Sequence, residues 1–115
     1  MEEKFFDIDS FLVHTGNDRS FARDIANESL RIMPEYLAQI HSALESGNAE
    51  QIRKASHKFK GGMRTIFALP AGDTAEHMEK TAASGDVASC LSLRTELDAV
   101  TASTIDAIEK YLAAE

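Results

Sequence analysis

The sequence predicts an all-α fold, an antiparallel four-helix bundle with a short additional N-terminal helix. Apolar residues recur at helical spacing over nearly the whole chain, and the alternation of aromatic and β-branched residues that is typical of strands is absent. The two prolines and six glycines fall mostly at expected boundaries between helices. Short connections between long amphipathic helices favour antiparallel neighbours. The 115 residues are expected to form one domain over residues 1–115.

The first two helices are delimited by capping residues and glycines. A short helix is expected over Asp9–His14 and is ended by Gly16. A long second helix is expected to begin after an N-cap at Asn17 or Asp18. Pro34 should kink this helix rather than end it, because the apolar stripe continues in phase. The stripe consists of Phe21, Ile25, Ile32, Met33, Tyr36, Leu37, Ile40 and Leu44.

Three further helices are expected in the second half of the chain. The segment Ser46–Asn48 ends the second helix and caps the third, which is expected to run to about Phe67. The fourth begins at Leu69–Pro70 and ends at Ser84–Gly85. A single fifth helix, capped by Asp86, continues almost to the C-terminus. The expected core positions are Ile52, Phe59, Met63 and Ile66, then Ala75, Met78 and Ala82, then Cys90, Leu93, Leu97, Val100, Thr104, Ile108 and Tyr111.

The overall composition bounds the function. The chain carries 19 acidic and 12 basic residues and a formal net charge of −7, which argues against nucleic-acid binding. The single cysteine, Cys90, is interpreted as a buried small residue. One cysteine permits no intrachain disulfide, which fits a reducing compartment. Residues 1–4 lack the order of a signal peptide, and no apolar run approaches the roughly 20 residues of a membrane span. We therefore expect a cytoplasmic protein with no membrane contact.

Against this acidic background, residues 51–72 contain no aspartate or glutamate. The same stretch holds five cations, Arg53, Lys54, Lys58, Lys60 and Arg64. A basic island of this kind is a local electrostatic device rather than a general affinity for polyanions.

A histidine lies in the middle of this island. On a helical wheel His57 falls about 140° from the core residue Ile52, which places its side chain in solvent. The same outer half of the helix is expected to hold Arg53, Lys60, Gly61 and Arg64. A neutral imidazole has a nucleophilic ring nitrogen, and Lys60, three residues on, can follow phosphoryl oxygens as a mobile point charge.

Two adjacent glycines follow. Gly61 and Gly62 each cost the helix about 1 kcal/mol relative to alanine, so they need a compensating reason. Close approach by another protein is such a reason.

This segment resembles the histidine-containing phosphotransfer (HPt) domains of bacterial two-component phosphorelays. Their signature is a histidine followed at the second, third and fourth positions by an apolar residue, a lysine and a glycine. Here these residues are His57, Phe59, Lys60 and Gly61, preceded by Ala55 and followed by the small Gly62. The likeness covers nearly the whole chain, including Pro34 and the Gly85–Asp86 turn. Phe67 departs from the family, many of whose members have a glycine near the end of this helix.

The resemblance implies a role for each residue of the motif. His57 would take a phosphoryl group from an aspartate of a response-regulator receiver domain and pass it to another receiver. Lys60 would steady the phosphate, and Gly61 would let the partner approach. The expected partners are receiver domains and/or a hybrid sensor kinase, and the expected partner surface comprises Gly61, Gly62, Arg64, Lys54 and Arg53. Such modules have no kinase activity and bind no ATP, and this chain has no Gly-rich nucleotide loop.

Two other functions remain open. One is a non-transferring helical adaptor that binds receiver or kinase domains through the same surface. The other is an enzyme. This function is the least favoured, because no general-base pair, nucleophile triad or cofactor loop is present. No cofactor is expected, and no histidines or carboxylates are grouped at metal-ligand spacing. The remaining histidines are interpreted as structural or solvated, and Glu76, Glu79 and Lys80 as an ordinary solvated face.

Overall fold

The computed structural model describes residues 4–114 and confirms the all-α fold, with no strand among these residues. Residues 1–3, part of the start that lacks a signal-peptide pattern, and residue 115 lie outside the described residues. The helices are α1 (Ile8–His14), α2 (Arg19–Ser46), α3 (Ala49–Thr65), α4 (Leu69–Ala83), α5 (Val87–Ser92) and α6 (Arg94–Ala114). No helix in the described part of the chain is long and apolar enough to cross a bilayer.

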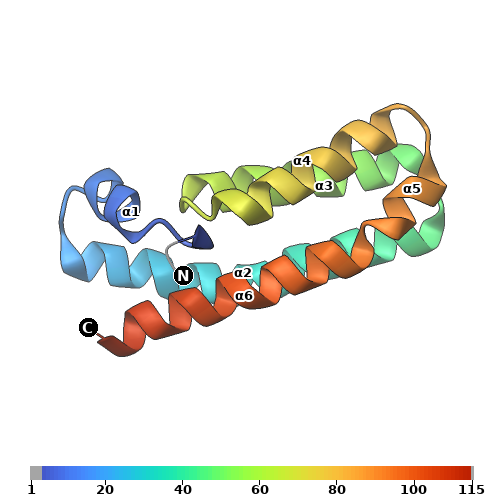
Figure 1. Ribbon diagram of the computed structural model, residues 1–115. Helices are drawn as coiled ribbons and strands as arrows, with labels where there is room; N and C mark the ends of the chain where they lie inside the picture. Colours follow the sequence, from blue (N-terminus) through green and yellow to red (C-terminus); the bar gives the residue numbers. More distant parts are fainter. Residues whose placement is uncertain (1–3, 115) are drawn as a thin grey trace.

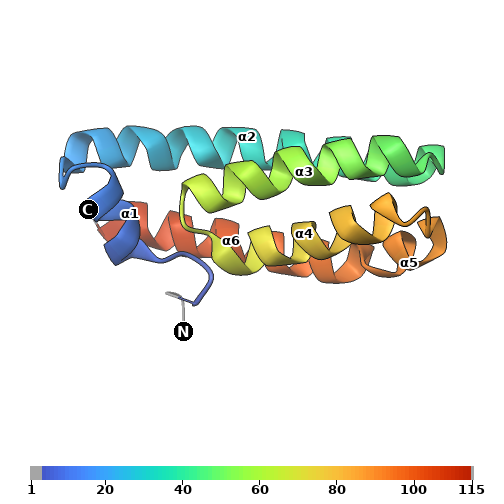
Figure 2. The same cartoon turned by 90° about the horizontal axis from the view of Figure 1, so that it is seen from above.

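Four long helices form an elongated bundle of 42 × 22 × 19 Å (Figure 1). Seen from above in Figure 2, α3 lies beside α2 on one side and α4 on the other. Figure 1 shows α6 beside α2 and beneath the pair α3 and α4. The short α1 packs across the end of the bundle where α2 begins. The arrangement confirms the predicted four-helix bundle with a short N-terminal helix, and it leaves α3 with two neighbours.

The predicted caps are present. The side chains of Asp18, Asn48 and Asp86 each accept a hydrogen bond from the backbone N–H three residues on, at 3.0 Å. These bonds satisfy donors that the first turn of a helix leaves free. Gly47 ends α2 in the left-handed conformation, with φ of 67°. As predicted, α2 continues through Pro34 rather than ending there.

The prediction of a single fifth helix was wrong. The chain forms two helices, α5 and α6, separated by a turn at Leu93, whose N–H donates to the carbonyl of Cys90 at 3.0 Å. Figure 1 shows α5 at an angle to α6. The apolar spacing is preserved through this turn, so Cys90 and Leu97 are both fully buried. Spacing alone therefore cannot reveal the break.

The turn after α3 has a backbone conformation that suits glycine. The helix ends at Thr65, two residues before the predicted end, and Phe67 has a φ of 63°. That left-handed conformation favours glycine, and a large side chain adopts it at a cost. The turn is held by backbone bonds from Ala68 N–H to Met63 O at 2.8 Å and from Asp7 N–H to Phe67 O at 3.0 Å.

The core follows the predicted stripes in α3 and α4, whose seven predicted positions are all buried. The predicted stripe of α2 is only partly correct. Phe21 is 50% exposed, and Ile25, Ile32, Tyr36 and Leu37 are half-buried. Met33, Ile40 and Leu44 are buried as predicted. The rest of the buried face of α2 consists of small residues, which let neighbouring helices approach closely: Ala22, Ala26, Ser29 and Ala43.

Candidate functional site

His57 lies in the middle of α3, and 64% of its side chain is exposed. Its position matches the solvent-facing placement inferred from the helical wheel. One ring nitrogen, Nδ1, lies 2.9 Å from Oε2 of Glu79 on α4. The histidine is therefore not a free surface side chain, because a carboxylate of the neighbouring helix holds one edge of its ring.

Glu79 also contacts the second residue of the motif. Its Oε1 lies 2.7 Å from Nζ of Lys60, and the two side chains are only 16% and 18% exposed. Burial raises the pKa of the Glu79 carboxyl, but hydrogen bonds from Lys60 and His57 lower it by more, so its pKa lies below the ordinary value of 4.5. The interpretation of Glu79 as a solvated residue was wrong, because α4 turns this side chain toward α3.

The packing of α3 on α4 brings these groups together. The face of α4 toward the bundle is rich in small buried residues, among them Ala71, Gly72 and Ala75. A Cβ placed on Gly72 would lie 3.0 Å from Cγ of Arg64, so the arginine stem uses the space that glycine leaves. Close approach of the two helices sets the α4 carboxylates over the α3 cations.

Most of the basic island is consequently paired with acids. Arg53 donates to both carboxylate oxygens of Glu50 at 2.8 Å. Arg64 lies 3.2 Å from Asp73 and 3.3 Å from Glu76. Arg53 and Arg64 lie on the same helix as His57, and their charges are neutralised by carboxylates within the protein.

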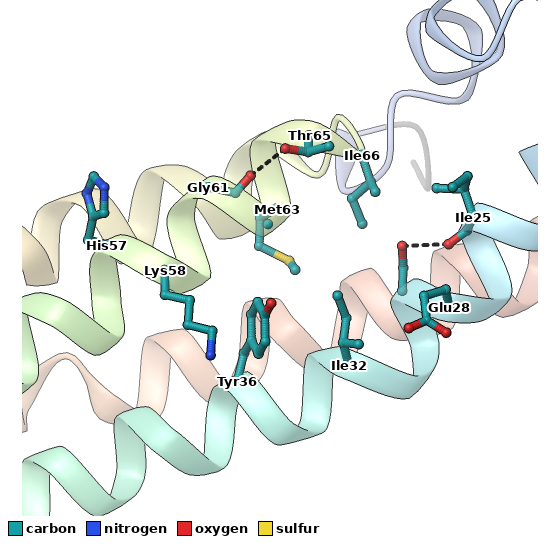
Figure 3. Close-up of a pocket in the computed structure, with 12 residues that line it drawn as sticks. Ile25, Glu28, Ile32, Tyr36, His57, Lys58, Gly61, Met63, Thr65 and Ile66 are labelled. Atoms are coloured by element: carbon teal, nitrogen blue, oxygen red, sulfur yellow. Dashed lines mark hydrogen bonds between the residues drawn. The ribbon is translucent and has the colours of Figure 1, made fainter.

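A groove opens on the other side of α3, toward α2 (Figure 3). It has a volume of about 390 Å³, and His57 and Lys58 lie at one end. The remaining lining is largely apolar and consists of Ile25, Glu28, Ser29, Ile32, Tyr36, Gly61, Gly62, Met63, Thr65 and Ile66. Three half-buried residues predicted as core of α2, Ile25, Ile32 and Tyr36, therefore line a surface groove.

The two glycines differ in their surroundings. A Cβ on Gly61 would have no atom within 4 Å apart from its own helix and its chain neighbours, so Gly61 is open to a partner. A Cβ on Gly62 would lie 3.3 Å from the ring of Tyr36, so Gly62 lets α3 pack against that ring. The pair thus leaves open space at Gly61 and permits close packing within the bundle at Gly62.

The contact between His57 and Glu79 fixes which ring nitrogen carries the proton. An ionised carboxylate only accepts hydrogen bonds, so Nδ1 carries the proton and donates it to Glu79. The lone pair is then on Nε2, on the exposed edge of the ring. The arrangement offers a nucleophilic nitrogen to solvent with a lysine ammonium nearby. Residues 4–114 contain no group of three or more histidine, cysteine, aspartate or glutamate side chains that could hold a metal ion.

The sequence analysis did not identify Glu79 as a site residue, although the sequence contains a signal for its position. An antiparallel hairpin of α3 and α4 that turns near residue 68 places residue 79 level with His57. The same register sets Arg64 against Gly72, as the structure shows. Helix pairing, rather than local pattern, is the information that locates this carboxylate.

The sequence model of the Hpt domain family matches residues 24–109. No curated protein matches the sequence. The fold is similar to the crystal structure of histidine-containing phosphotransfer protein B (HptB) from Pseudomonas aeruginosa PAO1, with a TM-score of 0.88 and 18% identity over 96% of each chain. It is also similar to the HPT domain of a sensor hybrid histidine kinase from Shewanella, with a TM-score of 0.82 and 16% identity over 97% of each chain.

Proposed function

The chain belongs to the Hpt domain family, and on this premise we propose that it carries a phosphoryl group on His57, taken from a receiver-domain aspartate and passed to another receiver. The observation that carries the proposal is the exposed imidazole whose Nδ1 is held by Glu79, which leaves Nε2 as the nucleophile. The chain acts as a carrier without kinase activity of its own and works in the cytoplasm.

The proposed step is a direct phosphoryl transfer. The lone pair of Nε2 attacks the phosphorus of the aspartyl phosphate, and an N–P bond forms as the P–O bond to the aspartate breaks. The aspartate leaves as a carboxylate. Nδ1 keeps its proton, so the imidazole ring of the product is positively charged. The reverse reaction on a second receiver returns the ring to its neutral form.

Glu79 and Lys60 assist in different ways. The carboxylate of Glu79 lies against the edge of the ring where positive charge develops, and it stabilises the phosphorylated ring. Nζ of Lys60 is held by Glu79 beside His57, from where the long side chain can reach phosphoryl oxygens. Lys60 is a phosphate-stabilising residue, and Glu79 is a positioning residue for His57.

The α2–α3 groove is the proposed docking surface for the receiver. Its apolar lining supplies area that a partner can cover, and Gly61 leaves the approach to His57 unobstructed. The partner is a response-regulator receiver, either free or attached to a hybrid sensor kinase. The similar domain from Shewanella belongs to a hybrid kinase, which supports the second possibility for this chain.

The test is phosphorylation by a receiver domain. A receiver phosphorylated with acetyl phosphate should transfer an acid-labile label to the wild-type chain and to His77→Gln, a control at an exposed histidine on α4. His57→Gln should accept none while keeping its helical circular-dichroism spectrum. Retained labelling of His57→Gln would refute the proposal, and receiver binding without transfer to the wild type would favour the adaptor function instead.

A further inference from the structure

The cations of α3 fall on two flanks of His57. At about 100° per residue, Arg53, Lys60 and Arg64 lie 20–60° from His57 in one direction, toward α4. Lys54 and Lys58 lie about 60° and 100° away in the opposite direction, toward α2. In Figure 3, the ring of His57 points away from α2, whereas Lys58 extends toward it.

The α4 flank carries little unpaired positive charge. Lys60 is paired with Glu79, and Arg64 is paired with Asp73 and Glu76. Arg53 is paired with Glu50 on its own helix. Each cation on this flank already has a carboxylate partner, so an acidic protein approaching from the α4 side meets a neutralised surface.

The α2 flank is different. Lys58 is exposed, its Nζ lies 4.6 Å from the centre of the Tyr36 ring, and it donates to Oε1 of Gln39 at 3.3 Å. Both partners are uncharged. Lys54 is exposed and has no carboxylate within 4 Å among residues 4–114, although its charge contributes to the lowered pKa of Glu50. Two ammonium groups one turn apart thus remain available on this side of His57.

These lysines line a second groove of about 360 Å³ along the same α2–α3 seam, where most lining residues are polar in type. Its lining comprises Gln39, Ser42, Ala43, Gln51, Lys54, Ala55 and Lys58. Lys58 borders both this groove and the apolar groove beside His57. A partner that covers the seam therefore meets apolar side chains at one end and two unpaired cations at the other.

We propose that Lys54 and Lys58 bind an acidic segment on the surface of the receiver domain and thereby set the side from which the receiver approaches His57. The inference rests on the proposed function and adds the charge that the partner must present. Complementary charge raises the rate of encounter and fixes register more than it adds to affinity. Gly61, the open glycine, lies about 40° from His57 on this same flank.

The experiment uses a charge reversal and a matched control. The variant is Lys54→Glu/Lys58→Glu. The control is Lys80→Glu/Lys110→Glu, which makes the same change in net charge at two exposed lysines on α4 and α6. The donor is the receiver domain that transfers fastest to the wild-type chain among those encoded in its own genome. Transfer is measured between 50 and 500 mM NaCl (roughly 14 to 4 Å in Debye length).

The charge reversal should lower the second-order rate constant of transfer about tenfold at low salt, and the control less than about twofold. The wild-type rate should fall with added salt, and the rate of the variant should not. Labelling of His57 by phosphoramidate, a small donor that needs no docking, should be equal in both proteins.

Three results would overturn the inference. The first is an equal transfer rate in the variant and the control, and the second is a wild-type rate that is independent of salt. The third is a loss of phosphoramidate labelling in the variant, which would place the lysines in the chemistry rather than in docking. Failure of the wild type to accept from every receiver tested is distinguishable from these results. It would remove the proposed function together with the docking site.

Discussion

Replacement of Glu79 by glutamine tests whether the α4 carboxylate governs the reactivity of His57. Glu79→Gln keeps the shape of the side chain and removes its charge. A hydrogen bond to an ionised group contributes about 1.5–3 kcal/mol and a neutral one about 0.5–1.5 kcal/mol, so the loss is about 1 kcal/mol. We take the lower end of the difference because 64% of the His57 side chain is exposed and solvent screens its charge. The expected effect is an about fivefold slower transfer to His57.

Two measurements are needed, because a slower rate alone does not separate positioning from general damage. Single-turnover transfer from a phosphorylated receiver gives the rate. Nitrogen-15 NMR of the imidazole gives the tautomer, which should be almost entirely protonated on Nδ1 in the wild type and mixed in Glu79→Gln. The matched control is Glu76→Gln on the same helix, since Glu76 bonds Arg64 and not His57.

The same substitution in a Lys60→Ala background identifies the route. Glu79 holds both His57 and Lys60, so its loss could act through either side chain. If Glu79 acts through the ring, most of the fivefold effect persists without the lysine. Equal rates and an unchanged tautomer in Glu79→Gln would refute the reasoning.

Three further predictions concern neighbouring positions. Lys60→Ala should slow transfer and also lower the free energy of unfolding in urea by about 1 kcal/mol, because the poorly exposed carboxylate of Glu79 loses its cation. Wild-type values of both quantities would show that Lys60 has neither role. Gly61→Glu should weaken receiver binding in calorimetry while the helix melts no lower, since its Cβ has open space and glutamate is the better helix former; unchanged affinity would show that the partner avoids this face. Phe67→Gly should be about 1 kcal/mol more stable to urea than Phe67→Ala, because both lose the ring and only glycine tolerates a φ of 63° freely; equal stability would argue against strain at this turn.

The fold could be predicted because its signals are local. An N-cap bonds a residue three positions away, and the capping residues Asp18, Asn48 and Asp86 are all present in the structure. A buried helical face repeats every three or four residues, which located the cores of α3 and α4. The turn at Leu93 was not predictable in this way, because α5 and α6 keep the spacing of one continuous stripe.

The site was only half accessible to the same reasoning. The position of His57 in solvent follows from the wheel of one helix. A helical wheel describes one helix and cannot show that α3 has a second neighbour. The sequence analysis therefore placed Lys60 and Arg64 on a solvent-facing basic face. Both are paired with acids of α4, and Glu79 is among them. Likewise, Ile32 and Tyr36 have the spacing of core residues but line a groove, because the buried face of α2 runs through Ala26, Ser29 and Met33.

Because α3 contacts α4 on one side and α2 on the other, the groups proposed for phosphate chemistry and those proposed for partner choice lie on two sides of one helix. The groups that surround the reactive ring come from α3 and α4, and the apolar groove is completed by α2. On the proposed function, substitutions at Ile25, Ile32 or Tyr36 are therefore expected to change the choice of receiver without changing the groups around His57. On the proposed function, a duplicated copy of this chain would change its receiver by divergence along the α2–α3 groove while keeping the contacts of Glu79 with His57 and Lys60.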